Sequence, residues 1–118
     1  MRAHHGSARN QKKKKLFKAA KGFRGARSKH YKVVIQSVKR AEAAAYVGRK
    51  QKKRDMRRLW ITRLNIASRA QGLPYSRLIA GLQKADIRLD RKQLSELAIH
   101  QPEAFAQIVS QAKAALDG

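Results

Sequence analysis

The sequence predicts an all-α protein, in which a long basic N-terminal helical arm is followed by a small C-terminal helical bundle. Three observations support this prediction. Good helix formers run from about residue 27 to residue 71 with no proline and a single glycine, Gly48. After residue 59, apolar residues recur at helical spacing in short blocks that glycine and proline separate. Positive charge, finally, is concentrated in the first half of the chain.

The arm is predicted to span residues 1–58 and the globular domain residues 59–118, because their charges differ sharply. The arm carries twenty-one Lys and Arg against two acids, a net charge of +19. Residues 59–118 carry eight against five, a net charge of +3. A surface as basic as the arm needs a dense array of negative charge beside it. The phosphate backbone of a nucleic acid is the commonest such array, since each contact releases condensed counterions.

Two segments precede the long helix of the arm. Residues 1–9 show no periodicity and are expected to form a mobile tail in the free protein. Residues 10–21 favour a first helix, with Asn10 as its N-cap. Gly22 and Gly25 then indicate a break or turn.

The long helix is expected from about residue 27 to residue 71, with Ser28 near its start and Gly48 as the place for a bend. One of its faces carries a narrow apolar seam, formed by Tyr31, Val34, Val38, Ala41 and Ala45. Because this seam is rich in alanine, it suits a close partner such as another helix or RNA.

A basic stripe follows the same helix. Its six residues form two parallel rows at four-residue spacing: Arg49, Lys53 and Arg57 in one row, and Lys50, Arg54 and Arg58 in the other. Like charges at this spacing destabilise a helix by roughly a few tenths of a kcal/mol per pair. A partner that supplies anions removes that cost, so we expect the free arm to be partly unfolded and to order on binding.

Two other interpretations of these basic residues are a solvated charged face and a membrane-surface helix. The density of charge disfavours a merely solvated face. Membrane binding needs a broad apolar face opposite the charge, whereas the seam is mostly alanine. No apolar run approaches the ~18 residues of a membrane span, so no membrane partner is expected.

Residues 59–118 are predicted to form the helical bundle. Gly72 is expected to end the long helix, Ser76 and Asp90 to cap two short helices, and Pro102 to open the last one. The apolar faces of these helices form the predicted core: Leu78, Ile79, Leu82, Leu94, Leu97, Ala98, Phe105, Ile108, Val109 and Ala112.

Two aromatic residues allow either a structural or a functional interpretation. The turn at residues 22–28 could bring its backbone close to a phosphate while Phe23 stacks on a base, or it could be an ordinary helix break with a buried Phe23. Trp60 is in phase with Met56 and Leu64, which favours core packing. Its basic neighbours also allow a stacking platform.

Several kinds of site are excluded by composition. The chain has no cysteine, hence no disulfide, no thiolate zinc site and no thiol nucleophile, which fits a reducing cytosol. Its four histidines do not share a helix face, so no metal site is expected: His4, His5, His30 and His100. The seven acids are scattered and no phosphate-binding glycine loop is present. We therefore expect no cofactor and no enzymatic activity.

Three segments resemble the bacterial ribosomal protein L-twenty family of the large subunit. They are AKGFRGARS at 20–28, KRDMRRLWITRLN at 53–65 and LPYSRLIAGLQKADIRLDRKQL at 73–94. They occur in the family's order and spacing, and the resemblance covers about residues 12–116. The chain departs from the family at its start, where a His-containing, Lys-rich segment replaces the usual short basic tail and Arg-rich helix.

This resemblance implies a structural constituent of the ribosome, cytoplasmic or in an organellar ribosome of bacterial type. It implies an arm threaded through large-subunit rRNA, a C-terminal domain on an rRNA junction, neighbouring large-subunit ribosomal proteins and a role in early subunit assembly. In some bacteria the family also represses its own operon by binding a leader mRNA, which is the alternative function. A DNA-architectural or antimicrobial cationic protein is a further alternative, which the motif match disfavours.

The residues expected to bind RNA are basic residues of the arm: Arg9, Lys12, Lys13, Lys14, Lys15, Lys18, Lys21, Arg24, Arg27, Lys29, Lys32, Arg49, Lys50, Lys53, Arg54, Arg57 and Arg58. Lys binds a phosphate as a point charge, while Arg can span two of its oxygens.

Overall fold

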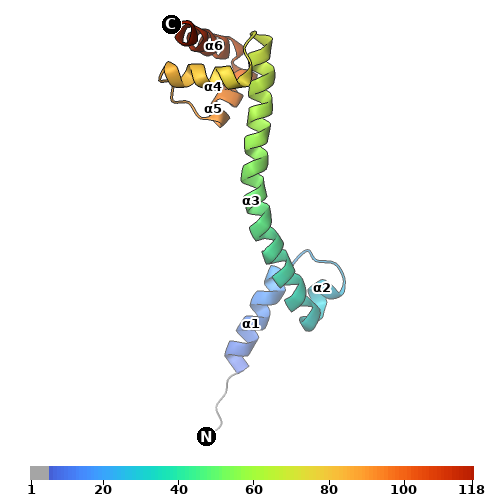
Figure 1. Ribbon diagram of the computed structural model, residues 1–118. Helices are drawn as coiled ribbons and strands as arrows, with labels where there is room; N and C mark the ends of the chain where they lie inside the picture. Colours follow the sequence, from blue (N-terminus) through green and yellow to red (C-terminus); the bar gives the residue numbers. More distant parts are fainter. Residues whose placement is uncertain (1–5) are drawn as a thin grey trace. The chain divides into compact units, whose positions relative to one another are not determined.

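The computed structural model describes residues 6–118, and these residues form helices and the turns between them (Figure 1). Six helices follow in chain order: α1 (Gly6–Ala19), α2 (Ala26–Lys29), α3 (Tyr31–Ala70), α4 (Tyr75–Lys84), α5 (Arg91–His100) and α6 (Pro102–Asp117). No strand occurs in this range. The predicted all-α class, with one long helix ahead of several short ones, is confirmed.

Packing divides the chain into two compact units, and the boundary lies between Gln51 and Lys52, inside α3. The first unit contains α1, α2 and the beginning of α3, and the second contains the rest of α3 with α4, α5 and α6. Independent folding of residues 59–118 is a separate property, and the predicted domain boundary after residue 58 stays a prediction.

The first unit has a small core where the end of α1 meets the start of α3. The buried residues are Ala20, Val34 and Val38, and the half-buried residues around them are Leu16, Phe17 and Phe23. The alanine-rich seam thus finds a helix as its partner at Val34 and Val38, whereas Ala41 and Ala45 are exposed.

The start of the arm differs from its prediction. Helix α1 begins at Gly6, so Asn10 lies within the helix rather than at its N-cap, and Gly6–Arg9 are helical rather than part of a tail. Residues 6–9 lack an apolar period, but Ser, Ala and Arg are compatible with a helix, so α1 can begin there without an apolar face. The rest of the predicted tail, residues 1–5, lies outside the described residues.

The predicted break between the two helices of the arm is confirmed. Gly22 and Gly25 have φ angles of 90° and 63°, in the region that favours glycine. Ser28 lies inside the single turn of α2, and its hydroxyl donates to the Gly25 carbonyl at 3.1 Å. The backbone then becomes extended at His30, with φ −92° and ψ 116°, so α3 begins at Tyr31, later than predicted.

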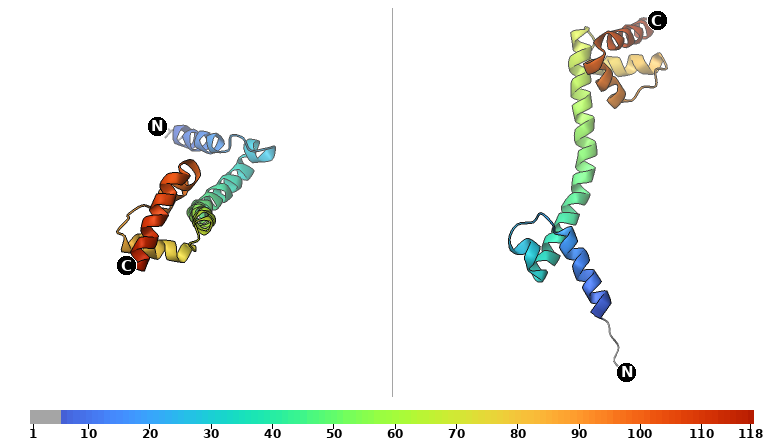
Figure 2. Two further views of the ribbon diagram at one scale, coloured as in Figure 1. Left: turned by 90° about the horizontal axis from the view of Figure 1, so that it is seen from above. Right: turned by 180° about the vertical axis from the view of Figure 1, so that it is seen from behind.

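In the second unit, α4, α5 and α6 gather beside the C-terminal end of α3, as Figures 1 and 2 show. Their core consists of Leu64, Leu73, Leu78, Leu82, Leu94, Phe105, Val109 and Ala112. Six of the predicted core residues are among these, and four others, Ile79, Ala98, Ile108 and Leu97, are half-buried. The predicted helical bundle is therefore confirmed.

Most of the helix ends that neighbouring residues predicted in this unit are confirmed. Gly72, with φ 78°, ends α3: its N–H donates to the Arg69 carbonyl, and the Leu73 N–H donates to the Ser68 carbonyl, both at 2.9 Å. This pair of bonds is the Schellman motif. Pro102 opens α6 as predicted.

The start of α4 differs from its prediction. Ser76 lies inside α4, which begins at Tyr75, and no side chain caps its N-terminus. Instead, the Pro74 carbonyl accepts the first helical bond, from the Leu78 N–H at 3.0 Å. Pro74 has the extended conformation of an N-cap residue, φ −69° and ψ 153°, so its backbone fills the role expected of Ser76.

Candidate nucleic-acid interface

The predicted RNA-binding residues lie on the surface. Sixteen of the seventeen are exposed, and Lys13 is half-buried. The Lys13 ammonium nitrogen lies 5.2 Å from the centroid of the Tyr31 ring, a cation–π contact that joins α1 to α3. Lys50 makes a similar contact within α3, 4.7 Å from the Tyr46 ring centroid. The side chains of the other candidates are exposed to the surroundings of the protein.

Acidic side chains neutralise little of this charge. Within residues 6–118, a single ion pair involves the arm: Arg58 Nη1 lies 3.8 Å from Asp55 Oδ1, and both side chains are well exposed. Exposed pairs of this kind contribute little. The two other pairs, Asp86–Arg88 and Glu96–His100, lie in the second unit. The positive charge of the arm is therefore almost uncompensated within the described part of the protein.

Three guanidinium groups line one hollow of the first unit. This arginine hollow has a volume of ≈ 480 Å³ and is lined by Gly22, Phe23, Arg24, Arg27, Ser37, Arg40 and Ala41. Arg24 and Arg27 were predicted to bind RNA, and the structure brings them together with Arg40, which was not. Arg40 has no basic residue four positions away on either side, so the four-residue spacing that revealed the basic stripe could not reveal it.

The turn beside this hollow combines an open backbone with an anchored aromatic ring. A Cβ atom added to Gly22 or Gly25 would meet nothing within 4 Å, so the backbone there is accessible from outside. Phe23, in contrast, is half-buried against the core of the first unit. The structure therefore favours the structural interpretation of Phe23 and leaves the glycines open to a close approach.

A second cluster of predicted residues lies along α1. A shallow hollow of ≈ 530 Å³ is lined by Ala8, Gln11, Lys12, Lys14, Lys15 and Lys18. Its four lysines lie on one α-helix, so their charges are neighbours on its surface. The lysine-rich run thus presents a local basic surface rather than scattered charges.

The basic stripe ends beside α5. A hollow of ≈ 500 Å³, here called the Trp60 hollow, is lined by Lys53, Arg54, Arg57, Trp60, Asp90, Arg91 and Lys92. Trp60 is half-buried and lies outside the core cluster of the second unit, so its predicted role in the core is wrong. Arg91 and Lys92 were not predicted. Their position after the cap residue Asp90 was visible in the sequence, but the approach of α5 to α3 was not.

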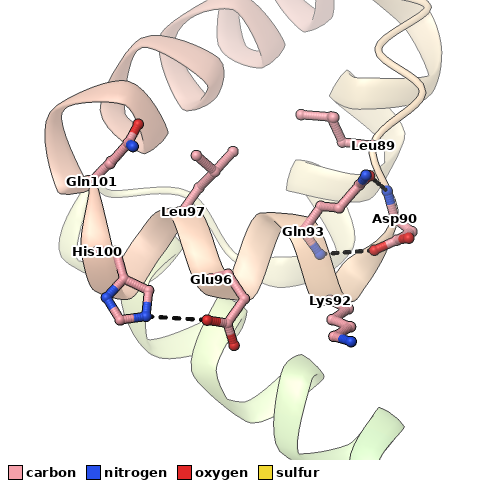
Figure 3. Close-up of a pocket in the computed structure, with 8 residues that line it drawn as sticks. All are labelled: Leu89, Asp90, Lys92, Gln93, Glu96, Leu97, His100 and Gln101. Carbon is pink, nitrogen blue, oxygen red and sulfur yellow. Dashed lines mark hydrogen bonds and ion pairs between the residues drawn. The ribbon is translucent and has the colours of Figure 1, made fainter.

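A hollow of the second unit contains two carboxylates and one imidazole. It has a volume of ≈ 670 Å³ and is lined by Leu89, Asp90, Lys92, Gln93, Glu96, Leu97, His100 and Gln101 (Figure 3). Both of its carboxylates have structural partners. Asp90 and Gln93 form the capping box of α5, in which the Gln93 N–H donates to Asp90 Oδ1 at 2.7 Å. Glu96 Oε2 lies 3.1 Å from His100 Nε2.

The described residues form neither a metal-binding cluster nor a membrane-spanning helix. Residues 6–118 hold no group of His, Asp and Glu side chains placed to bind a metal ion. His4 and His5 lie outside this range. None of the helices described is both long enough and apolar enough to cross a membrane.

Comparison with known proteins extends these observations. The family model described as "Ribosomal protein L20" matches residues 2–108. Three curated relatives bear the name "Large ribosomal subunit protein bL20". The one from Thermotoga maritima is 58% identical over 106 residues, which is 90% of either chain. The one from Chloroflexus aggregans is 51% identical over 115 residues, 98% of this chain and 97% of the relative.

The third relative, from Synechococcus sp., is 52% identical over 113 residues, which is 96% of either chain. The similarity therefore covers the arm and the bundle together, and it includes the three segments that resembled the L-twenty family. On these matches, the chain belongs to the ribosomal protein L20 family.

Proposed function

We propose that this protein is a structural, non-enzymatic component of the large ribosomal subunit that binds large-subunit rRNA directly and supports early assembly of that subunit. The main support is the exposed, nearly uncompensated positive charge of the arm, with one weak ion pair among its described residues. The relatives, named as large-subunit ribosomal proteins, point to the same partner.

The chemistry of folded RNA explains why such an arm is useful. Phosphates crowd together where RNA helices converge, and their mutual repulsion opposes compaction. Lys and Arg side chains lower that repulsion and release counterions. A helix as long as α3 holds these charges in a fixed order along the RNA. The arm would thus stabilise a junction while it forms, which is an assembly role rather than a catalytic one.

Different parts of the arm would make different contacts. In the arginine hollow, one phosphate group could meet the guanidinium groups of Arg24, Arg27 and Arg40 near an open glycine backbone. Each guanidinium can donate two parallel hydrogen bonds to phosphate oxygens. The lysines of α1 would instead act as point charges beside the RNA backbone. Neighbouring ribosomal proteins complete the proposed set of partners.

Co-sedimentation with purified large ribosomal subunits through a high-salt cushion tests this proposal. We expect the full chain to remain with the subunits after a wash that removes proteins bound only by loose charge attraction. Release into the supernatant, with equal affinity for duplex DNA and rRNA, would favour a general cationic DNA-binding protein instead.

Repression of the protein's own operon stays a separate prediction. It requires the same surface to bind a leader mRNA that imitates the rRNA site. Competition between an rRNA fragment and a leader-mRNA fragment for the full chain measures it directly. Mutual displacement is expected if the two RNAs share a site, and simultaneous binding would contradict that.

A further inference from the structure

The Trp60 hollow combines an aromatic ring with a rim of positive charge. Helix α3 supplies Lys53, Arg54, Arg57 and Trp60, and the start of α5 supplies Asp90, Arg91 and Lys92. Five of these side chains are cationic and one is anionic, so the rim has a net charge of +4. All seven residues belong to the second unit.

Trp60 lies outside the core cluster of the second unit. Its side chain is half-buried, so part of the ring stays accessible. An indole ring in this position exposes part of an apolar, electron-rich surface among cations. Such a surface gains stability from a flat ligand that stacks on the ring.

Part of the rim is held in place before any ligand binds. The Nε–H of Arg91 donates to the hydroxyl oxygen of Tyr75 at 2.8 Å, which fixes a half-buried guanidinium beside the hollow. The Asp90 carboxylate is fixed by the capping box, as Figure 3 shows together with Lys92 at the start of α5. Binding would therefore cost less conformational entropy than it would for freely rotating side chains.

We propose that the Trp60 hollow binds an unpaired RNA nucleotide, whose base stacks on the Trp60 indole while its flanking phosphates contact Arg57, Arg91 and Lys92. A single-stranded nucleotide is the component of RNA that offers a free aromatic face next to negative charge. Paired bases inside a duplex offer only their edges. The volume of ≈ 500 Å³ is in the range of small-ligand sites, about 300–1,000 Å³. This inference rests on the proposed function and specifies its ligand at one site.

The test uses the full chain, whose single tryptophan makes its fluorescence a reporter of this hollow. Two RNA probes with equal numbers of phosphates are compared: a blunt duplex, and a shorter duplex with unpaired nucleotides at one end. Affinity is measured by anisotropy of the labelled RNA, at a salt concentration high enough to weaken the phosphate contacts of the arm. The probe with unpaired nucleotides should change the tryptophan emission, and the duplex should not.

Variants at position 60 distinguish stacking of Trp60 on an RNA base from packing of Trp60 within the protein. Trp60→Leu keeps an apolar side chain but removes the aromatic face, and it should weaken binding of the unpaired probe by roughly 5- to 150-fold. Its affinity for the duplex should be unchanged. Trp60→Phe keeps an aromatic face and should retain most of the affinity. Leu59→Ala, at an exposed neighbour outside the hollow, is the matched control and should bind both probes as the wild type does.

The outcomes decide between the two proposals. Wild-type binding without any change in emission, together with full affinity in Trp60→Leu, would overturn the nucleotide site and leave the proposed rRNA binding intact. If Trp60→Leu lost the same amount of affinity for both probes, the nucleotide site would also be overturned. Failure of the wild type to bind the unpaired probe would overturn the nucleotide site, while the co-sedimentation experiment decides the proposed rRNA binding. If circular dichroism shows that Trp60→Leu is unfolded, two other results decide on the nucleotide site. They are the change in wild-type emission with the unpaired probe and the affinity of Trp60→Phe for that probe.

Discussion

Gly81 of α4 lies against the backbone of Ala112 in α6. A Cβ atom added at Gly81 would lie 2.5 Å from the Ala112 carbonyl oxygen and 2.9 Å from the Ala112 Cβ. Because a glycine at this position has no side chain, the two helices approach more closely than any other residue would allow. Ala112 is fully buried, so this contact lies within the core of the second unit.

Gly81→Ala should therefore destabilise the bundle. The added methyl group meets backbone atoms of α6 that cannot rotate away, and overpacking of this kind costs about 1–3 kcal/mol. Higher helix propensity offsets about 1 kcal/mol of that cost. Gly48→Ala is the control, because Gly48 is an exposed helical residue with nothing within 4 Å, and it should instead raise helicity. Chemical denaturation followed by circular dichroism measures both. A Gly81→Ala variant that gains as much stability as Gly48→Ala would contradict the close contact.

Two buried serines should respond differently to replacement by alanine. Ser95 is fully buried, and its hydroxyl has no hydrogen-bond partner among the described residues. Ser95→Ala removes this unpaired group and should raise the free energy of unfolding by about 1 kcal/mol. Ser68 is equally buried, but its hydroxyl donates to the Asn65 carbonyl at 3.3 Å. Ser68→Ala loses that bond and should be the less stable variant in a denaturant titration. If Ser95→Ala were the less stable variant, the hydrogen bonding described for the two hydroxyl groups would be contradicted.

A fragment of residues 59–118 should fold alone as a helical domain. The buried residues of the second core, from Leu64 to Ala112, all lie within this fragment. It also keeps the Schellman motif at Gly72 and the capping box at Asp90. Cooperative thermal unfolding by circular dichroism is the expected result. A coil-like spectrum that changes gradually with temperature would show that the fragment depends on the rest of the chain.

The arm should exchange its amide hydrogens quickly when no RNA is present. Its core contains three buried residues, none larger than valine, and its basic residues repel one another. Hydrogen exchange measured on the free protein should therefore give little protection over residues 1–50 and strong protection in the bundle. RNA should then slow exchange in the arm. Strong protection of the arm in the free protein would contradict this expectation.

The sequence predicted those features that depend on neighbouring residues. Asp90 was identifiable as a cap because its partner Gln93 is three residues away. Gly72 was identifiable as a helix end because a positive φ favours glycine. The break at His30 was not predictable, because no glycine or proline marks it.

The site was predictable only in part, for the same reason. The basic stripe repeats every four residues along one helix, so its rows could be found without knowledge of the fold. Arg91 and Lys92 join Trp60 only because the start of α5 and a segment of α3 line the same hollow, and this arrangement depends on tertiary structure. The spacing of Trp60 from Met56 and Leu64 indicated that the three residues share one helix face. That spacing does not show how far along the helix the core extends.

The most direct test of the central claim, that the basic stripe contacts RNA phosphates, is the salt dependence of rRNA binding. The logarithm of affinity is measured against the logarithm of salt concentration for the wild type, Arg54→Ala and Arg57→Ala. Arg88→Ala is the control, because Arg88 lies outside the stripe and is paired with Asp86 at 3.0 Å. We predict weaker binding and a slope reduced by up to about one unit for each stripe variant, with no change for the control. Stripe variants that keep the affinity and slope of the wild type would contradict the claim.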